Sequence, residues 1–287
     1  LHSDTHSFPT RRSSDLDDPD NYEEFYTAKE RIHGSSIASL IIHGDLTTNN
    51  KPLTSRVYLR PIMLPAPDDF HSPRHEKVRD DILPVDLIHR SIKRIFEGDE
   101  GEEPLAPSIK IINLSIGDNS RPFSQIMSPL SRLLDWLSMK YKVLFIVSAG
   151  NNLNPIKTNL STAELDEGQN DRLEEEIIKS IYKDIRNRKL LSPSESINSL
   201  TVGAVHDDNS KIKGQLSNFV PFKKFLPSPI SALGLGYRRT IKPDLVYSGG
   251  RVLFKKPIIS QQNLELIPVD FLSPPGNKVA SPDNKGN

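Results

Sequence analysis

His33 is the side chain whose neighbours best suit it to acid–base chemistry. It stands in the run Arg31–Ile42, R-I-H-G-S-S-I-A-S-L-I-I, where glycine and two hydroxyl residues follow it and a pattern of apolar and small residues continues. This pattern predicts a buried helix that begins near His33 and carries a reactive imidazole at its start. An imidazole titrates near neutral pH, so it can accept and return a proton during catalysis. A histidine that caps a helix or is satisfied in a core fits the same local pattern equally well.

Two other segments place small and polar residues directly after a largely apolar run. Ile109–Leu114 is followed by Ser-Ile-Gly at 115–117, and Val143–Val147 is followed by Ser-Ala-Gly-Asn-Asn at 148–152. The continuous apolar run at 143–147 is typical of a parallel sheet that is covered on both faces. Taken singly, a strand ending in glycine and a Gly-Asn turn are both common. The evidence for a function is therefore the order in which these segments follow one another along the chain.

In that order, four segments between residue 31 and about residue 281 resemble subtilisin-like serine proteases. The His33 run resembles the family motif H-G-[ST]-x-[VI]-A-x-[IL], residues 111–117 resemble I-N-[ML]-S-[LF]-G, and residues 147–152 resemble [AS]-A-G-N. The fourth segment resembles the family elements that lead towards the nucleophile, and it comprises Val202–Val205, Ser217–Phe219, Lys242–Leu245 and Asn277–Pro282. The chain departs from the family pattern at Val220-Pro221 and at 247–250, Tyr-Ser-Gly-Gly, which indicates a divergent branch with long insertions.

The resemblance implies a fold and a role for each segment. It implies an α/β, three-layer fold with a central, mostly parallel sheet. His33 would be the general base, and the side chain of Asn151 would donate to the oxyanion of the tetrahedral intermediate. An extended polypeptide substrate would run beside the S-x-G backbone. The residues expected to line the substrate cleft are Ser115, Ile116, Gly117, Ser148, Ala149 and Gly150.

Two members of the catalytic triad are expected to lie outside these residues. The family nucleophile stands in G-T-S-x-[AS], and no G-T-S occurs in the sequence. The acidic member is expected in a D-[ST]-G strand before the histidine motif, but Asp15, Asp17, Asp18 and Asp20 are not flanked by an apolar strand. We therefore expect a fold that is incomplete at both ends and a chain that is inactive as it stands, because the histidine alone cannot carry out acyl transfer at useful rates.

Two alternatives to a serine endopeptidase follow from the sequence. A pseudoprotease would keep the groove only to bind a peptide or protein, and its gene would lack the missing triad residues altogether. Another α/β hydrolase or a nucleotide-binding domain is disfavoured, because neither G-x-S-x-G nor a P-loop is present.

No metal site and no cofactor are predicted. His71-Ser-Pro-Arg-His75-Glu76 contains two metal-ligand residues, but Pro73 breaks the helical i,i+4 geometry and no third ligand is apparent. Calcium, which relatives commonly bind, leaves no identifiable motif. His89 with Arg90, Lys93 and Arg94 forms a basic helix surface that we interpret as a solvated face.

The elements that must position these residues alternate between helix and strand. Helical patterns cover 33–43, 82–97, 126–141 and the highly charged stretch 162–190, and strand patterns cover 56–63, 109–114, 143–147, 200–205 and 241–246. The amphipathic pattern at 82–97 places five apolar residues on one face, namely Leu87, Ile88, Ile92, Ile95 and Phe96. Alternation of this kind favours an α/β fold with a parallel sheet.

Composition narrows the class of protein. The 287 residues hold 36% hydrophobic and 26% charged residues, with 37 basic and 37 acidic side chains, so net charge gives no reason to propose nucleic acid or an acidic membrane as a partner. There is no cysteine, which excludes a thiol nucleophile and favours a cytoplasmic location. No apolar run of transmembrane length and no signal peptide are seen, and no regulatory partner is indicated.

The expected organisation is one partial domain with a short leader. Residues 1–16 have no apolar period and look like translated sequencing adapter, so we treat them as non-native or disordered. Residues 17–287 would form the partial peptidase domain, with insertions around 65–107 and 153–192.

Overall fold

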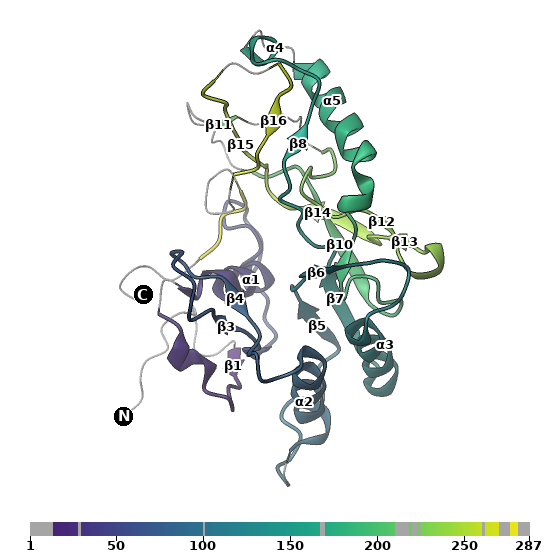
Figure 1. Cartoon of the computed structure of the whole chain (residues 1–287). Helices are drawn as coiled ribbons and strands as arrows, with labels where there is room; N and C mark the ends of the chain where they lie inside the picture. Colours follow the sequence, from purple (N-terminus) through teal and green to yellow (C-terminus); the bar gives the residue numbers. More distant parts are fainter. Residues whose placement is uncertain are drawn as a thin grey trace. The chain divides into compact units, whose positions relative to one another are not determined.

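The computed structural model divides the chain into two compact units. It describes residues 14–27, 30–99, 101–166, 170–209, 218–219, 223, 225–259, 262–269 and 276–280. The N-terminal unit comprises Leu1–Ser108 with Lys278–Asn287, and the sheet unit comprises Ile109–Asn277. Figure 1 shows the elements of both units. Among the described residues, no helix is long and apolar enough to span a membrane.

A parallel sheet of four strands is the framework of the sheet unit. Its strand order is β14-β10-β7-β5, with β5 at Ile111–Leu114, β7 at Leu144–Ser148, β10 at Leu200–Val205 and β14 at Leu245–Ser248. Every neighbouring pair is parallel. Phe145 and Val147 are almost fully buried, whereas Leu144 on the other face is 39% exposed, so the described residues do not cover this strand on both faces, contrary to what the apolar run predicted. The predicted α/β fold with a central parallel sheet is confirmed.

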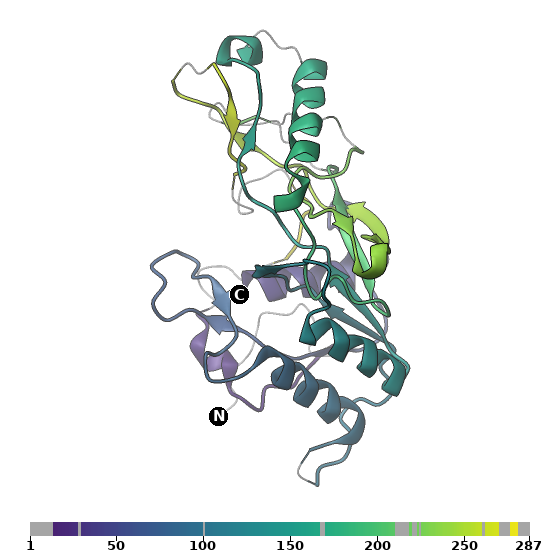
Figure 2. The same ribbon diagram turned by 45° about the vertical axis from the view of Figure 1, so that its right-hand side comes forward.

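Helix α3, Pro129–Tyr141, packs against strand β7 (Figures 1 and 2). Its start is fixed by Ser128, whose hydroxyl accepts a hydrogen bond from the backbone N–H of Ser131, and by Pro129 at the first helical position. The buried carboxylate of Glu195 accepts from the backbone N–H of Ser128 at 2.9 Å. Leu134 and Leu137 are fully buried on the inner face, in agreement with the pattern at 126–141.

The charged stretch 162–190 contributes buried apolar residues to the sheet unit. It contains α4, Thr162–Asp166, and α5, Asn170–Lys183, which runs alongside β8, Ile156–Lys157 (Figure 2). Leu173 and Ile177 on α5 belong to a second apolar cluster with residues from β8, β15 and β16. Only one stripe of the helix is apolar, so its charged face stays in solvent while that stripe is buried.

Short strand pairs and single helical turns complete the sheet unit. The antiparallel pairs are β6 (Asp118–Pro122) with β9 (Leu191–Ser192), β8 with β16 (Glu265–Leu266), β11 (Asn218–Phe219) with β15 (Phe254–Lys255), and β12 (Gly234–Leu235) with β13 (Ile241–Lys242). The single turns are η3 (Ile185–Asn187) and η4 (Tyr237–Arg239). The strand predicted at 241–246 is thus divided between β13 and β14, because Pro243 has no N–H to continue the ladder.

The N-terminal unit packs helices against short strands. It contains β1 (Ser14–Leu16) parallel to β2 (Val57–Leu59), η1 (Tyr22–Phe25), α1 (Ile32–His43), the hairpin β3 (Leu64–Pro65) and β4 (Glu76–Lys77), and α2 (Pro84–Glu97). Four of the five apolar residues predicted for the inner face of α2 are buried, namely Leu87, Ile88, Ile92 and Ile95. Residues 14–16 of the expected leader form a strand, and residues 1–13 lie outside the described part of the chain.

Candidate active site

His33 lies in the first turn of α1 with its side chain exposed. The opposite side of the helix is buried through small residues, because Ser35, Ala38 and Ser39 allow close packing. A Cβ placed on Gly34, the next residue, would meet nothing within 4 Å. The structure shows no hydrogen bond between the imidazole of His33 and any other described residue. The helix therefore holds the backbone of His33 in place and leaves its ring accessible.

The segment 278–280 lies along the same helix. The backbone N–H of Ala280 donates to the hydroxyl of Ser39 at 3.0 Å, and the N–H of Lys278 donates to Oδ1 of Asp45 at 3.2 Å. The N–H of Leu46 donates to the carbonyl of Lys278 at 2.9 Å. These residues belong to the segment expected to lead towards the nucleophile, so the structure brings it onto the helix that carries His33. Ser281 and Pro282 lie outside the described residues.

The two segments expected to line the substrate cleft meet at the carboxyl end of the sheet. They follow β5 and β7, which are neighbours with Leu114 opposite Val147. A Cβ on Gly117 would lie 3.7 Å from the Cα of Gly150, and a Cβ on either glycine would contact Leu191. Glycine at both positions therefore permits the two chain segments to approach each other. Ligands in open α/β sheets bind at the carboxyl ends of the strands.

The backbone around Asn151 is held from three sides. The N–H of Ala149 donates to Val202, and its carbonyl accepts from Leu191. The carbonyl of Gly150 accepts from Ala232 at 2.9 Å, and the N–H of Asn152 donates to Ile230 at 2.7 Å.

Asn151 itself is bridged to Ser231 through its backbone, while its side chain is exposed. Where the structure describes the chain, no partner for this side-chain amide is seen. A rigid backbone with an available amide donor is the arrangement that oxyanion stabilisation requires.

The sheet unit contains a hollow of about 480 Å³. It lies where the chain leaves β6 and enters α3, and its apolar lining includes Phe123, Ile126 and Met127. Phe123 also packs against Ala149, which links the wall of the hollow to the segment before Asn151.

Asp17, one of the acidic residues before His33, forms hydrogen bonds and ion pairs within the N-terminal unit. Asp17 follows β1, accepts from the hydroxyl of Tyr58 at 2.5 Å and pairs with Arg60 at 3.5 Å and Arg94 at 3.3 Å. Burial, followed by the hydrogen bond to Asp17, raises the pKa of Tyr58, so its hydroxyl remains a donor. Sequence analysis assigned Asp17 no role in the triad, and these contacts indicate a structural role. Its partners are distant in sequence, so no local pattern could reveal them.

The candidate general base and the candidate oxyanion donor belong to different units. His33 is positioned by contacts within the N-terminal unit, and Asn151 by contacts within the sheet unit. Of the fourth segment, the residues in β10, β11, β13 and β14 and Asn277 belong to the sheet unit, and residues 278–280 belong to the N-terminal unit. Ser217, Ser281 and Pro282 lie outside the described residues, as do Val220 and Pro221, where the chain departs from the family pattern.

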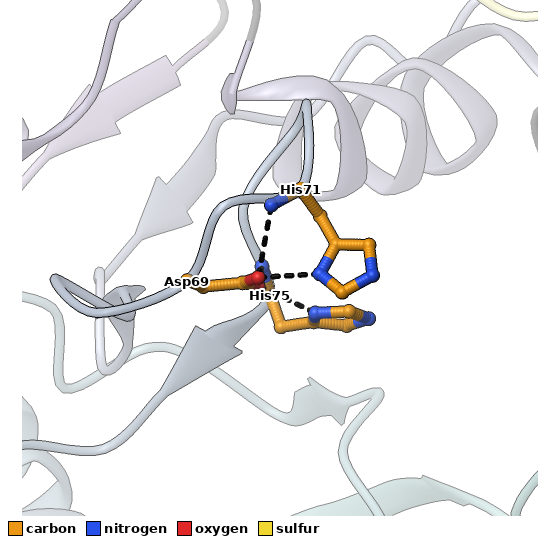
Figure 3. Close-up of side chains that lie close together, drawn as sticks. All are labelled: Asp69, His71 and His75. Carbon is orange, nitrogen blue, oxygen red and sulfur yellow. Dashed lines mark hydrogen bonds and ion pairs between the residues drawn. The ribbon is translucent and has the colours of Figure 1, made fainter.

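Sequence analysis considered His71 and His75 as metal ligands but found no third one, and in the structure Asp69 lies beside them. His71 and His75 lie beside Asp69 in the loop of the β3–β4 hairpin (Figure 3). The signal was the spacing D-x-H-x-x-x-H, which has no meaning on a helix interrupted by Pro73 but brings all three side chains together in a hairpin loop.

Comparison with known proteins gives a family match over nearly the whole chain. Residues 2–277 match the model of the subtilase family, peptidase S8. The uncharacterized protein y4bN of Sinorhizobium fredii is 28% identical over 160 residues, which are 53% of this chain and 33% of y4bN. The chain thus spans about a third of the length of that relative.

Solved structures of proteases are also similar at low identity. The prenylagaramide maturation protease PagA is 16% identical with a TM-score of 0.42, covering 89% of this chain and 62% of that chain. A mutant of the protease domain of PatA is 17% identical with a TM-score of 0.41, covering 89% and 66%. The MycP3 protease from the type VII (ESX-3) secretion system is 16% identical with a TM-score of 0.35, covering 83% and 57%.

Proposed function

The chain belongs to the subtilase family, peptidase S8, and we propose on this premise that the protein is a serine endopeptidase acting on polypeptides. Peptide bonds would be hydrolysed by Ser/His/Asp acyl transfer, with His33 as general base and Asn151 in the oxyanion hole. The nucleophilic serine and the acidic residue would come from outside these 287 residues. The observation that carries the proposal is the exposed amide of Asn151 on a backbone fixed at the carboxyl end of β7.

His33 would move the proton in both halves of the reaction. Its imidazole would accept the proton of the serine hydroxyl during attack and return it to the leaving amine. The exposed ring on a helix packed through Ser35, Ala38 and Ser39 suits this role, because the backbone is fixed while the ring stays open to a partner and a substrate. The contact of 278–280 with α1 supports an approach of the nucleophile from that segment.

Asn151 would stabilise the charge that develops on the carbonyl oxygen. In subtilisin the loss of one such donor costs about 3–4 kcal/mol of transition-state stabilisation. Gly150 lets the chain lie close to the side chain of Leu191, and main-chain hydrogen bonds of Ala149, Gly150 and Asn152 hold the backbone that carries Asn151.

The substrate would bind as an extended peptide. Ser115–Gly117 and Ser148–Gly150 would contact its backbone, an interaction that tolerates many side chains. The hollow lined by Phe123, Ile126 and Met127 would accept an apolar side chain of the substrate.

A fluorophosphonate probe on the full-length protein tests the assignment of His33. The wild type should be labelled covalently, and His33→Ala should abolish labelling because the serine is then no longer activated. His43→Ala, at the other end of the same helix, is the matched control and should be labelled like the wild type. Equal labelling of His33→Ala and wild type would remove His33 from the mechanism.

The second candidate is a pseudoprotease that binds peptides or proteins in the same groove. The absence of G-T-S from these residues is the observation that favours it. A full-length sequence without that motif, together with no fluorophosphonate labelling of the wild type, would favour the binding protein over the enzyme.

A further inference from the structure

Three metal-ligand side chains converge in the loop that joins β3 to β4. The Nδ1 atom of His71 lies 2.5 Å from Oδ1 of Asp69, and the Nδ1 atom of His75 lies 2.5 Å from Oδ2 (Figure 3). The two rings meet edge to face, with centroids 4.7 Å apart. One ligand atom from each residue lies within 4.8 Å of the others. Two imidazole nitrogens and a carboxylate therefore face a common point.

The loop is closed by hydrogen bonds that fix its central carboxylate. The backbone N–H of Ala66 donates to the carbonyl of His75 at 2.8 Å, and the N–H of Asp69 donates to the carbonyl of Ala66 at 3.2 Å. The Asp69 carboxylate accepts from the backbone N–H of His71 at 3.0 Å and of His75 at 2.6 Å. These two hydrogen bonds fix the position of the Asp69 carboxylate within the loop.

The loop is also tied to the rest of the N-terminal unit. Arg74, between the two histidines, forms a bidentate pair with the buried Glu30, with distances of 2.5 and 3.0 Å. The hydrogen bond from Arg74 is the main reason that the pKa of Glu30 falls to about 2. At the base of the hairpin, the hydroxyl of Tyr26 donates to Glu76 at 2.7 Å. These contacts anchor the loop and the base of the hairpin to the rest of the N-terminal unit.

We propose that Asp69, His71 and His75 bind a divalent transition-metal ion, with zinc as the natural choice. Imidazole nitrogen with carboxylate oxygen suits zinc, whereas calcium and magnesium prefer oxygen ligands alone. Two Nδ1 atoms and one Asp69 oxygen would hold the ion, and water would complete the tetrahedron. This site does not depend on the proposed peptidase activity.

The geometry needs only a small adjustment to accept the ion. Ligands at about 2.0–2.1 Å from a tetrahedral zinc ion stand roughly 3.4 Å apart, so each ring must withdraw from the carboxylate by about 1 Å. The rings can do so because the side chains of His71 and His75 are 72% and 74% exposed, whereas that of Asp69 is 11% exposed and held by the loop.

Zinc titration of the untagged full chain by calorimetry tests the site. We expect one ion per chain, with at least about tenfold weaker binding in His71→Gln and in His75→Gln, because each loses a ligand. Asp68→Asn removes an exposed charge next to Asp69 without removing a ligand, so its affinity should equal that of the wild type. No binding by the wild type, or unchanged affinity in either histidine variant, would overturn the proposal.

A second measurement keeps the test decisive if a variant folds poorly. The side-chain nitrogen signals of His71 and His75 in the wild-type chain should both shift on addition of one equivalent of zinc. Shifts confined to other histidines would show that zinc binds elsewhere and would contradict the assignment.

Discussion

At the scale of single residues, burial keeps the imidazole of His206 neutral. His206 is fully buried, and its Nδ1 accepts from the backbone N–H of Val252 at 3.1 Å. Burial, together with the nearby charge of Arg251, lowers the pKa of His206 to about 4. The ring is therefore neutral in the folded chain at neutral pH.

This burial predicts a loss of stability in mild acid. The unfolded chain binds a proton at His206 near pH 6.5, whereas the folded chain does so only near pH 4. The free energy of unfolding should therefore fall as the pH drops from about 6.5 to 4, by on the order of 3 kcal/mol. Urea unfolding across this range measures it, and His206→Asn, which keeps an acceptor near Val252, should flatten the dependence. An unchanged slope in that variant would exclude His206 as its source.

The roles of single residues were only partly predictable. The sequence motifs singled out His33 and Asn151, and the structure shows both side chains exposed on held backbones. The spacing D-x-H-x-x-x-H did not by itself place Asp69 beside the two histidines, because the three side chains converge only once the β3–β4 hairpin has formed. The role of Asp17 likewise depends on Arg60 and Arg94, which are remote in sequence.

At the scale of elements, the loop after β7 depends on glycine at position 150. Gly150 has φ +105°, and a Cβ there would lie 2.5 Å from Cγ of Leu191. Gly150→Ala should lower the free energy of unfolding by at least about 2 kcal/mol, because it adds both backbone strain and overpacking.

Gly34→Ala is the matched control for that substitution, since its Cβ meets open space within α1. There the change should stabilise the chain by up to about 1 kcal/mol through helix propensity. Urea unfolding of both variants gives the comparison. A neutral Gly150→Ala would mean that the loop can relax away from Leu191.

The periodicity of apolar residues predicted the main helices and buried strands, but it did not predict how the charged stretch 162–190 packs. The pattern at 82–97 matches α2 closely, and the strand predicted at 200–205 is β10. The stretch 162–190 was interpreted as a surface insertion because its charge is high, yet its apolar stripe is buried in a separate cluster. Such a cluster forms between segments far apart in sequence, so composition alone could not indicate it.

At the scale of the whole molecule, the chain belongs to the subtilase family. The subtilase match covers residues 2–277, which include the His33 helix and the strands that lead to Ser115–Gly117 and Asn151. The division into an N-terminal unit and a sheet unit had no signal in the sequence, because it arises from how contacts are distributed in space.

The most direct test of the central claim is the turnover of an unfolded polypeptide by the full-length protein. The wild type should hydrolyse it, and Asn151→Ala should lower kcat by about 100- to 1,000-fold with little change in KM, because the lost donor acts in the transition state. Asn154→Ala, in the same loop, should retain the wild-type kcat. Equal kcat for Asn151→Ala and wild type, or no hydrolysis by the wild type, would contradict the account.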